Sequence, residues 1–119
     1  MSPRVLVVDD NLDLAENLVE ILADAGFDAE CYDDPSAALH AVAPGRYQVA
    51  LIDLRMPGMD GVELHRALKA LDPCLRALAM TAFARDTLVA TALHDGVLSV
   101  LSKPMDAGSL VQHVRRAVA

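Results

Sequence analysis

The sequence predicts an α/β fold, a doubly wound parallel sheet of five strands with helices on both faces. The first observation is strict alternation, because five short apolar runs are each followed by a segment whose apolar residues have helical spacing. The second is that residues 5–8 and 49–52 are apolar throughout, which is typical of strands buried on both faces. The third is that residues 27–32 alternate apolar with polar, which suits a sheet edge. Together they favour right-handed crossovers and the flavodoxin-like (βα)5 strand order 2-1-3-4-5.

Local signals mark where each element begins and ends. We expect strands at residues 5–8, 27–32, 49–53, 77–80 and 97–101, and helices at 12–25, 35–42, 60–71, 86–94 and 106–118. Gly26 is placed as a helix C-cap, and Asp34 followed by Pro35 is a cap with proline at the first helical position. Asp60 and Glu63 have capping-box spacing. These signals support all five β-α units.

Composition limits the possible functions. The 119 residues are enough for one domain, and 54% are hydrophobic while only 3% are aromatic, so aliphatic side chains must build the core. The formal net charge of -7 argues against direct binding to nucleic acid or to an anionic membrane. We find neither an apolar run of membrane-spanning length nor a signal peptide, and Cys31 and Cys74 form no metal or redox motif. A cytoplasmic domain with reduced thiols is expected.

Chemically active side chains follow four of the five strands. Asp9 and Asp10 come after the first strand, Asp53 ends the third, Thr81 follows the fourth and Lys103 follows the fifth. Parallel strands bring their carboxyl ends to one edge of the sheet, where open α/β proteins bind ligands. Each residue alone has an ordinary explanation: the first two aspartates could cap a helix, an aspartate at the end of one strand is common, the threonine could cap a loop and the lysine could be a solvated side chain. No structural requirement places all five at one edge, so the combination points to a site.

Three carboxylates at one edge need a cation. Two carboxylates ~4 Å apart repel by roughly 4 kcal/mol at an effective dielectric constant near 20. Lys103 can offset one charge, and a divalent cation with all-oxygen ligands, Mg²⁺ rather than Zn²⁺, can offset the others. An anion could then lie between the metal, Lys103, the Thr81 hydroxyl and a nearby backbone N–H, which makes a phosphoryl site. Asp53 is the expected nucleophile, forming an acyl phosphate.

The motifs resemble a known family. Asp9-Asp10, the strand ending at Asp53 with Met56-Pro57-Gly58-Met59-Asp60-Gly61 after it, Thr81-Ala82 and Lys103-Pro104 together resemble the receiver domain of two-component response regulators. The resemblance runs from residue 5 to the last helix, so residues 1–119 are expected to form a single receiver domain.

The resemblance implies a phosphoacceptor and a metal. Asp53 would accept a phosphoryl group from the phosphohistidine of a sensor histidine kinase or phosphotransfer protein, as a step of a phosphorelay. Asp10, Asp53 and the backbone carbonyl of Arg55 would bind Mg²⁺, with Mn²⁺ as an alternative, and Asp9 would act mainly through water. The domain would catalyse only its own phosphorylation and dephosphorylation and would not be an enzyme in the ordinary sense.

It also implies how the phosphoryl group is held and read out. Lys103, Thr81 and the Ala82 amide would contact its oxygens, and the Lys103–Pro104 bond would be cis. The output surface would be the fourth helix, fifth strand and fifth helix. It would contact a downstream effector domain or protein, or a second copy in a homodimer, with no direct nucleic-acid or membrane contact.

One position departs from the family. Receivers usually carry an aromatic residue three positions before the lysine, and here that residue is Val100. Because valine has no ring to swing inward, we expect a weaker or different rearrangement of loop 81–86, with Phe83 as its large apolar residue. In this family, residues placed like Arg55 and Phe83 influence how readily water attacks the phosphoryl group.

Two alternative functions and a group of histidines complete the expectations. A haloacid-dehalogenase-type phosphatase would need a carboxylate two residues after Asp53, where the chain has Arg55. A pseudo-receiver that is never phosphorylated would be expected to lack some of the site residues, and all are present. The four histidines fall on predicted helices away from the strand ends and are interpreted as surface or partly buried positions: His40, His65, His94 and His113.

Overall fold

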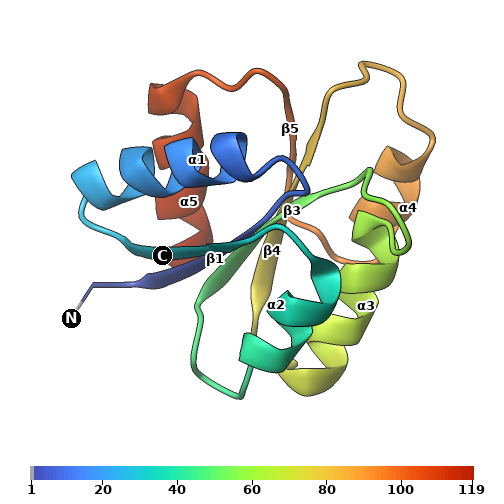
Figure 1. The fold of residues 1–119 in the computed structure, drawn as a ribbon, viewed down its shortest axis with the longest axis horizontal. Coiled ribbons are helices and arrows are strands. Elements are labelled where there is room, and N and C mark those ends of the chain that lie inside the picture. The colour runs from blue at the N-terminus through green and yellow to red at the C-terminus, as the bar shows by residue number, and fades with distance from the viewer. Residues whose placement is uncertain (1) are drawn as a thin grey trace.

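The computed structural model describes residues 2–119, and its strands form one parallel sheet in the order β2-β1-β3-β4-β5 (Figure 1). This is the predicted flavodoxin-like order, and the predicted fold class is confirmed. The elements are β1 (Arg4–Val8), α1 (Leu12–Asp24), β2 (Asp28–Tyr32), α2 (Pro35–Ala41), β3 (Val49–Asp53), α3 (Gly61–Leu71), β4 (Arg76–Thr81), α4 (Leu88–His94), β5 (Val100–Ser102) and α5 (Ala107–Val118).

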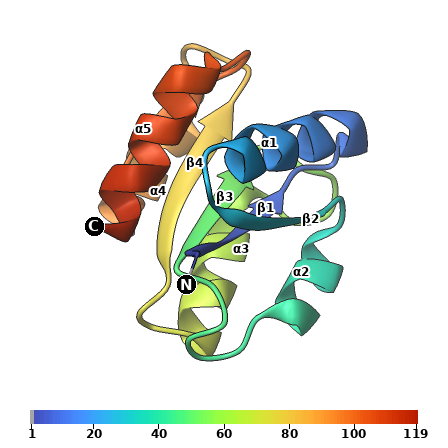
Figure 2. The ribbon, with the colours of Figure 1, turned by 90° about the vertical axis from the view of Figure 1, so that its left-hand side faces the viewer.

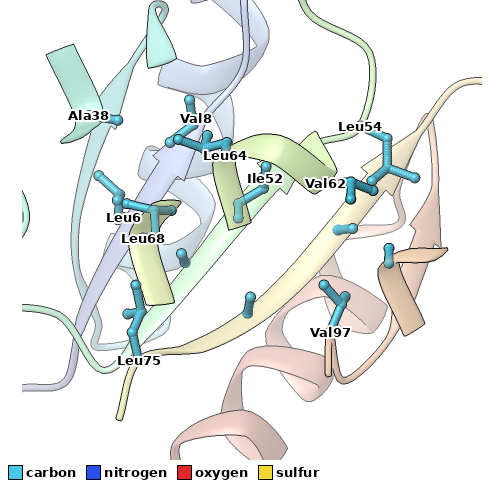
Figure 3. Close-up of a cluster of buried hydrophobic side chains, with 14 of the residues drawn as sticks. Leu6, Val8, Ala38, Ile52, Leu54, Val62, Leu64, Leu68, Leu75 and Val97 are labelled. Carbon is cyan, nitrogen blue, oxygen red and sulfur yellow. The ribbon is translucent and has the colours of Figure 1, made fainter. Parts of the chain in front are cut away.

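Helices cover both faces of the sheet. Figures 1 and 2 show α1 and α5 on one face and α2, α3 and α4 on the other. Each face has its own aliphatic core. In Figure 3, Leu6, Val8 and Ile52 point from the sheet toward Leu64 and Leu68 of α3. Alternate strand residues point to the opposite face, where the α1–α5 core packs.

Helix capping follows the sequence signals. Asn11 is the N-cap of α1 and accepts from the Leu14 amide, while Asp34 and Asp106 cap α2 and α5. The predicted capping box at α3 is complete: the Asp60 side chain accepts from the Glu63 amide, and the Glu63 side chain accepts from the Asp60 amide. Since Asn11 caps α1, neither Asp9 nor Asp10 is the N-cap of this helix, and Asp9 Oδ1 accepts from the Asn11 amide.

The fourth helix and the fifth strand are shorter than predicted. Strand 97–101 was expected, but β5 begins at Val100, because the Val97 amide donates to the Ala92 carbonyl and closes the end of α4. The helix predicted from Asp86 begins at Leu88, and the Asp86 carboxylate accepts from the Leu88 amide. Both differences arise because chain-end hydrogen bonds, which periodicity does not report, decide the boundary.

Two helix positions differ from expectation in burial. His65 of α3 is only 2% exposed, although a surface or partly buried position was expected, and its Nδ1 atom has no hydrogen-bond partner among the described residues. Leu71, the last residue of α3, is 44% exposed although it is apolar. Within residues 2–119, the helices are too short or too polar for any of them to cross a membrane.

Candidate functional site

The predicted site residues meet at the carboxyl edge of the sheet. Asp9 follows β1, Asp53 is the last residue of β3, Thr81 is the last residue of β4 and Lys103 follows β5. β3 is buried along its whole length and lies between β1 and β4, so the Asp53 side chain is delivered from the centre of the sheet. Asp10, next to Asp9, is exposed.

Lys103 joins two of the carboxylates. Its Nζ atom lies 2.7 Å from Asp9 Oδ2 and 3.1 Å from Asp53 Oδ2. Asp9 is fully buried and Asp53 is 4% exposed, so both ion pairs are shielded from bulk water. The cis peptide bond expected between Lys103 and Pro104 is present, and the Lys103 amide donates to the Thr81 carbonyl at 2.8 Å. These contacts fix the lysine at the centre of the site.

Burial makes the Asp53 carboxylate an unusually strong base for its type. The pKa of Asp53 is raised from 3.8 to about 6, chiefly by desolvation and also by the neighbouring Asp9 carboxylate, while the Arg55 amide and Lys103 oppose the change. The pKa of Lys103 is raised, because its contacts with the two aspartates outweigh the desolvation that would lower it. Lys103 is therefore charged at neutral pH, and its single charge leaves the acidic cluster undercompensated.

The acidic residues fit a hard divalent cation. Asp9, Asp10 and Asp53 each offer a carboxylate oxygen, and these atoms lie within 4.8 Å of one another. Asp9 Oδ2 is buried and, apart from its ion pair with Lys103, accepts no hydrogen bond from the described residues. An oxygen-only set of this kind suits Mg²⁺ or Mn²⁺.

The loop after β3 holds Asp53 in place. Its Oδ1 atom accepts from the Arg55 amide at 3.2 Å, and the loop is closed where the Gly61 amide donates to the Leu54 carbonyl at 2.9 Å. Gly58 has φ +83°, which favours glycine. A Cβ atom on Gly61 would lie 2.6 Å from the Asp53 carbonyl oxygen, so only glycine allows this approach.

Sequence reasoning missed Asp86. Its buried carboxylate accepts from the Thr81 hydroxyl at 2.8 Å and pairs with the Arg55 side chain, whose Nη2 lies 2.5 Å from Asp86 Oδ1. The Arg55 Nη2 atom also donates to Thr87 Oγ1 at 3.1 Å. The sequence predicts Asp86 only as the first residue of a helix. An acidic residue after a strand carries no signal that it will turn back to contact that strand.

The residues expected to be involved in switching differ in burial, and Thr81 is the buried one, at 4% exposure. Val100 is half-buried beside the core of the α2–α4 face, whereas Phe83 is 59% exposed. The Ala82 side chain is exposed, and the Phe83 amide donates to Thr81 Oγ1 at 3.1 Å. Loop 81–86 is therefore linked to the site through Thr81.

Comparison with known proteins gives a consistent result. A family model described as "Response regulator receiver domain" matches residues 5–115. The chain superposes on the signal receiver domain of NarL from Mycobacterium tuberculosis with a TM-score of 0.83 and 30% identity, covering 98% of this chain and 96% of that one. A CheY-like receiver domain from Methanospirillum hungatei JF-1 has a TM-score of 0.92 at 23% identity, covering 99% and 94% of the two chains, which shows the shared fold.

The similar curated proteins are longer than this chain. A response regulator receiver protein from Anaeromyxobacter sp. (strain Fw109-5) is 41% identical over 86% of this chain, which corresponds to 43% of that protein. DctD of Rhizobium meliloti, a transcriptional regulator of C4-dicarboxylate transport, is 34% identical over 98% of this chain and 25% of its own length. The chain thus spans less than half of either relative.

Proposed function

The chain belongs to the response regulator receiver family of two-component signalling, and from this premise we propose that it takes a phosphoryl group onto Asp53 in a Mg²⁺-dependent reaction and uses it to switch an output surface. The observation that carries the proposal is the arrangement of Asp9, Asp53 and Lys103, in which one buried lysine lies 2.7 and 3.1 Å from two buried carboxylates. Buried ion pairs contribute little to the stability of a fold, so stability does not explain two buried carboxylates and a lysine at one edge of the sheet.

The proposed reaction moves a phosphoryl group between two side chains. One Asp53 carboxylate oxygen forms a bond to phosphorus while the bond from phosphorus to the nitrogen of the partner's phosphohistidine breaks, and that histidine leaves with the bonding electron pair. Lys103 and the Thr81 hydroxyl stabilise the equatorial oxygens by ion pairing and hydrogen bonding, together with the Ala82 amide. Hydrolysis of the acyl phosphate by water would return Asp53 to its carboxylate.

The metal is assigned to the acidic edge. Asp10, Asp53 and the backbone carbonyl of Arg55 would hold Mg²⁺, with Asp9 acting through water. The bound cation would supply positive charge that lets a phosphoryl dianion approach three carboxylates. The buried Asp9 Oδ2 atom, which has Lys103 as its partner and accepts no other bond from the described residues, and the raised pKa of Asp53 support this assignment, since a bound cation would offset the excess negative charge.

The partners follow from the family and from the relatives. Receiver domains work with histidine kinases or phosphotransfer proteins and with effector domains or proteins. The curated relatives include MtrA of Mycobacterium tuberculosis, which is named as a DNA-binding response regulator. We propose that residues 2–119 act in the cytoplasm as the regulatory part, that output runs through α4, β5 and α5 to an effector or a second copy, and that any DNA contact belongs to another domain.

The phosphatase alternative gains no support from the site. A dehalogenase-type phosphatase needs an acid/base carboxylate two residues after the nucleophile, and the chain has Arg55 there, paired with Asp86. A domain that is never phosphorylated remains the useful contrast, because it would share the fold and differ only in chemistry.

Intact-protein mass spectrometry after incubation with acetyl phosphate tests the proposal. We expect one phosphoryl adduct on the wild type that requires Mg²⁺, is retained in the exposed-site control Glu20→Gln and is lost in Asp53→Asn. No adduct on a wild type that still binds Mg²⁺ would favour the domain that is never phosphorylated. An adduct that persists in Asp53→Asn would mean that another residue is the acceptor.

A further inference from the structure

The Thr81 hydroxyl is engaged away from Asp53. It donates to Asp86 Oδ2 at 2.8 Å and accepts from the Phe83 amide at 3.1 Å. Thr81 is 4% exposed and the Asp86 side chain is fully buried, so water does not compete for this bond. A hydroxyl has a single proton, and it cannot be donated to Asp86 and to an anion on Asp53 at the same time.

Three other nitrogen atoms, from Arg55 and Leu88, also donate hydrogen bonds to the Asp86 carboxylate. The Arg55 Nε atom donates to both of its carboxylate oxygens, at 3.1 and 3.0 Å, Arg55 Nη2 donates to Oδ1 at 2.5 Å, and the Leu88 amide donates to Oδ1 at 2.9 Å. These contacts, with Arg55 first, lower the pKa of Asp86 to about 2, so its carboxylate is charged throughout the neutral range. A charged, buried acceptor that is fixed by other hydrogen bonds competes strongly for the threonine proton.

The network also spans both loops of the site. Arg55 lies two residues after Asp53, Asp86 lies five residues after Thr81, and Leu88 is the first residue of α4. A change in the hydrogen bond between Thr81 and Asp86 can therefore affect the first residue of α4 directly, without involving β5 or Val100.

We propose that Asp86 is a positioning residue that holds the Thr81 hydroxyl out of the anion site, so that phosphorylation must take this hydroxyl from Asp86 and Asp86 sets the free energy of the switch. The inference rests on the proposed function, because the competing acceptor is the phosphoryl group on Asp53. Once Thr81 is withdrawn, Asp86 keeps Arg55 and the Leu88 amide, so it is not left as an unpaired buried charge. The exchange therefore leaves no buried charge without a partner, and it can be reversed when the phosphoryl group is lost.

Beryllofluoride, a mimic of the phosphoryl group on a carboxylate, gives a direct test when its binding is measured by ¹⁹F NMR with saturating Mg²⁺. Asp86→Asn keeps the shape but replaces a charged acceptor by a neutral one, which weakens the hold on Thr81. We expect beryllofluoride to bind roughly tenfold more tightly to Asp86→Asn, the difference between a charged and a neutral hydrogen bond. The matched control is Asp95→Asn, which removes another aspartate–arginine pair, 2.6 Å from Arg66, and leaves the affinity unchanged.

A double-mutant cycle separates positioning from a structural effect. In a Thr81→Val background no hydroxyl remains to be released, so Asp86→Asn should then change the affinity by less than about twofold. An equal gain in both backgrounds would overturn the inference, as would an unchanged affinity in Asp86→Asn alone. Failure of the wild type to bind beryllofluoride at all would instead refute the proposed function, and the inference with it.

A measurement on the wild type keeps the test independent of variant folding. The ¹³C signals of the Asp86 carboxyl and of Thr81 should shift together on adding beryllofluoride, because one hydrogen bond between them breaks. A shift at Thr81 with an unchanged Asp86 carboxyl would overturn the inference.

Discussion

Replacing Asp53 by asparagine should make the metal-free protein more stable while abolishing phosphorylation. Burial and the Asp9 carboxylate raise the pKa of Asp53 from 3.8 to about 6 in the folded state. One unit of pKa difference corresponds to about 1.36 kcal/mol, so ionisation of Asp53 lowers the free energy of unfolding of the wild type by at most about 3 kcal/mol. Solvent relaxation reduces that value. We therefore expect the free energy of unfolding of Asp53→Asn to exceed that of the wild type by about 1 to 3 kcal/mol at pH 7.5.

The stability difference between Asp53→Asn and the wild type should depend on pH. A folded pKa above the unfolded one favours the protonated carboxyl, so the stability from this group is fully present below pH 3.8 and is lost as the pH rises through about 6. The advantage of Asp53→Asn over the wild type should therefore fall to about half at pH 5. Added Mg²⁺ should narrow the gap at pH 7.5, because a ligand that binds only the folded wild type raises its free energy of unfolding with the logarithm of the free ligand concentration above Kd.

Urea unfolding in EDTA at pH 5 and pH 7.5, followed by circular dichroism, measures these differences. Glu20→Gln is the control, since it removes the same charge from an exposed helix position. If Asp53→Asn were as stable as the wild type or less stable at pH 7.5, the acidic edge would not be under electrostatic strain, and the argument for a resident cation would lose its physical basis.

Three further changes probe the metal, the loop and the core. Asp10→Asn should remove most of the Mg²⁺-induced rise in melting temperature while leaving the metal-free fold intact, as calorimetry with and without Mg²⁺ would show. Gly61→Ala places a Cβ atom 2.6 Å from the Asp53 carbonyl oxygen and 2.7 Å from Leu54 Cα, so we expect a loss of roughly 2 kcal/mol of stability in urea unfolding and a slower reaction with acetyl phosphate. Burial lowers the pKa of His65, so its contribution to stability is lost as the pH falls below 6.5, and His65→Leu should lose less stability than the wild type between pH 7.5 and pH 5 in the same unfolding assay.

The sequence was sufficient for the fold and for the meeting of the site residues because both depend on repeating rules. Five β-α units with two fully apolar strands leave few topologies, and parallel strands end at one edge. Asp9, Asp53 and Lys103 could thus be placed together without knowing any distance. Their roles in phosphoryl transfer and metal binding stay predictions, since they concern a chemistry that geometry alone does not test.

What the sequence could not supply depends on packing between elements. His65 is one more polar residue on α3 in the sequence, and its burial to 2% exposure becomes visible only when α3 packs against its neighbouring elements. The pairing of Arg55 with Asp86 joins residues 31 positions apart in two loops with no periodic pattern. Contacts of this kind arise from the path of each loop, for which local propensity gives no rule.

Val100 gives the Asp86 network its significance for signalling. Val100 is half-buried, packs against the core and pairs with Ala79 of β4, and a valine has no ring that could move to report the position of Thr81. The Thr81 hydroxyl already has two bonds that leave the site, one to the Phe83 amide and one to Asp86, and Asp86 in turn contacts the first amide of α4. Displacing one hydroxyl would alter both bonds, shifting an exposed phenylalanine and the helix start together. In the switch proposed above, a receiver without the ring would couple its site to α4 through this hydroxyl, and Asp86 would oppose the change until a phosphoryl group is present.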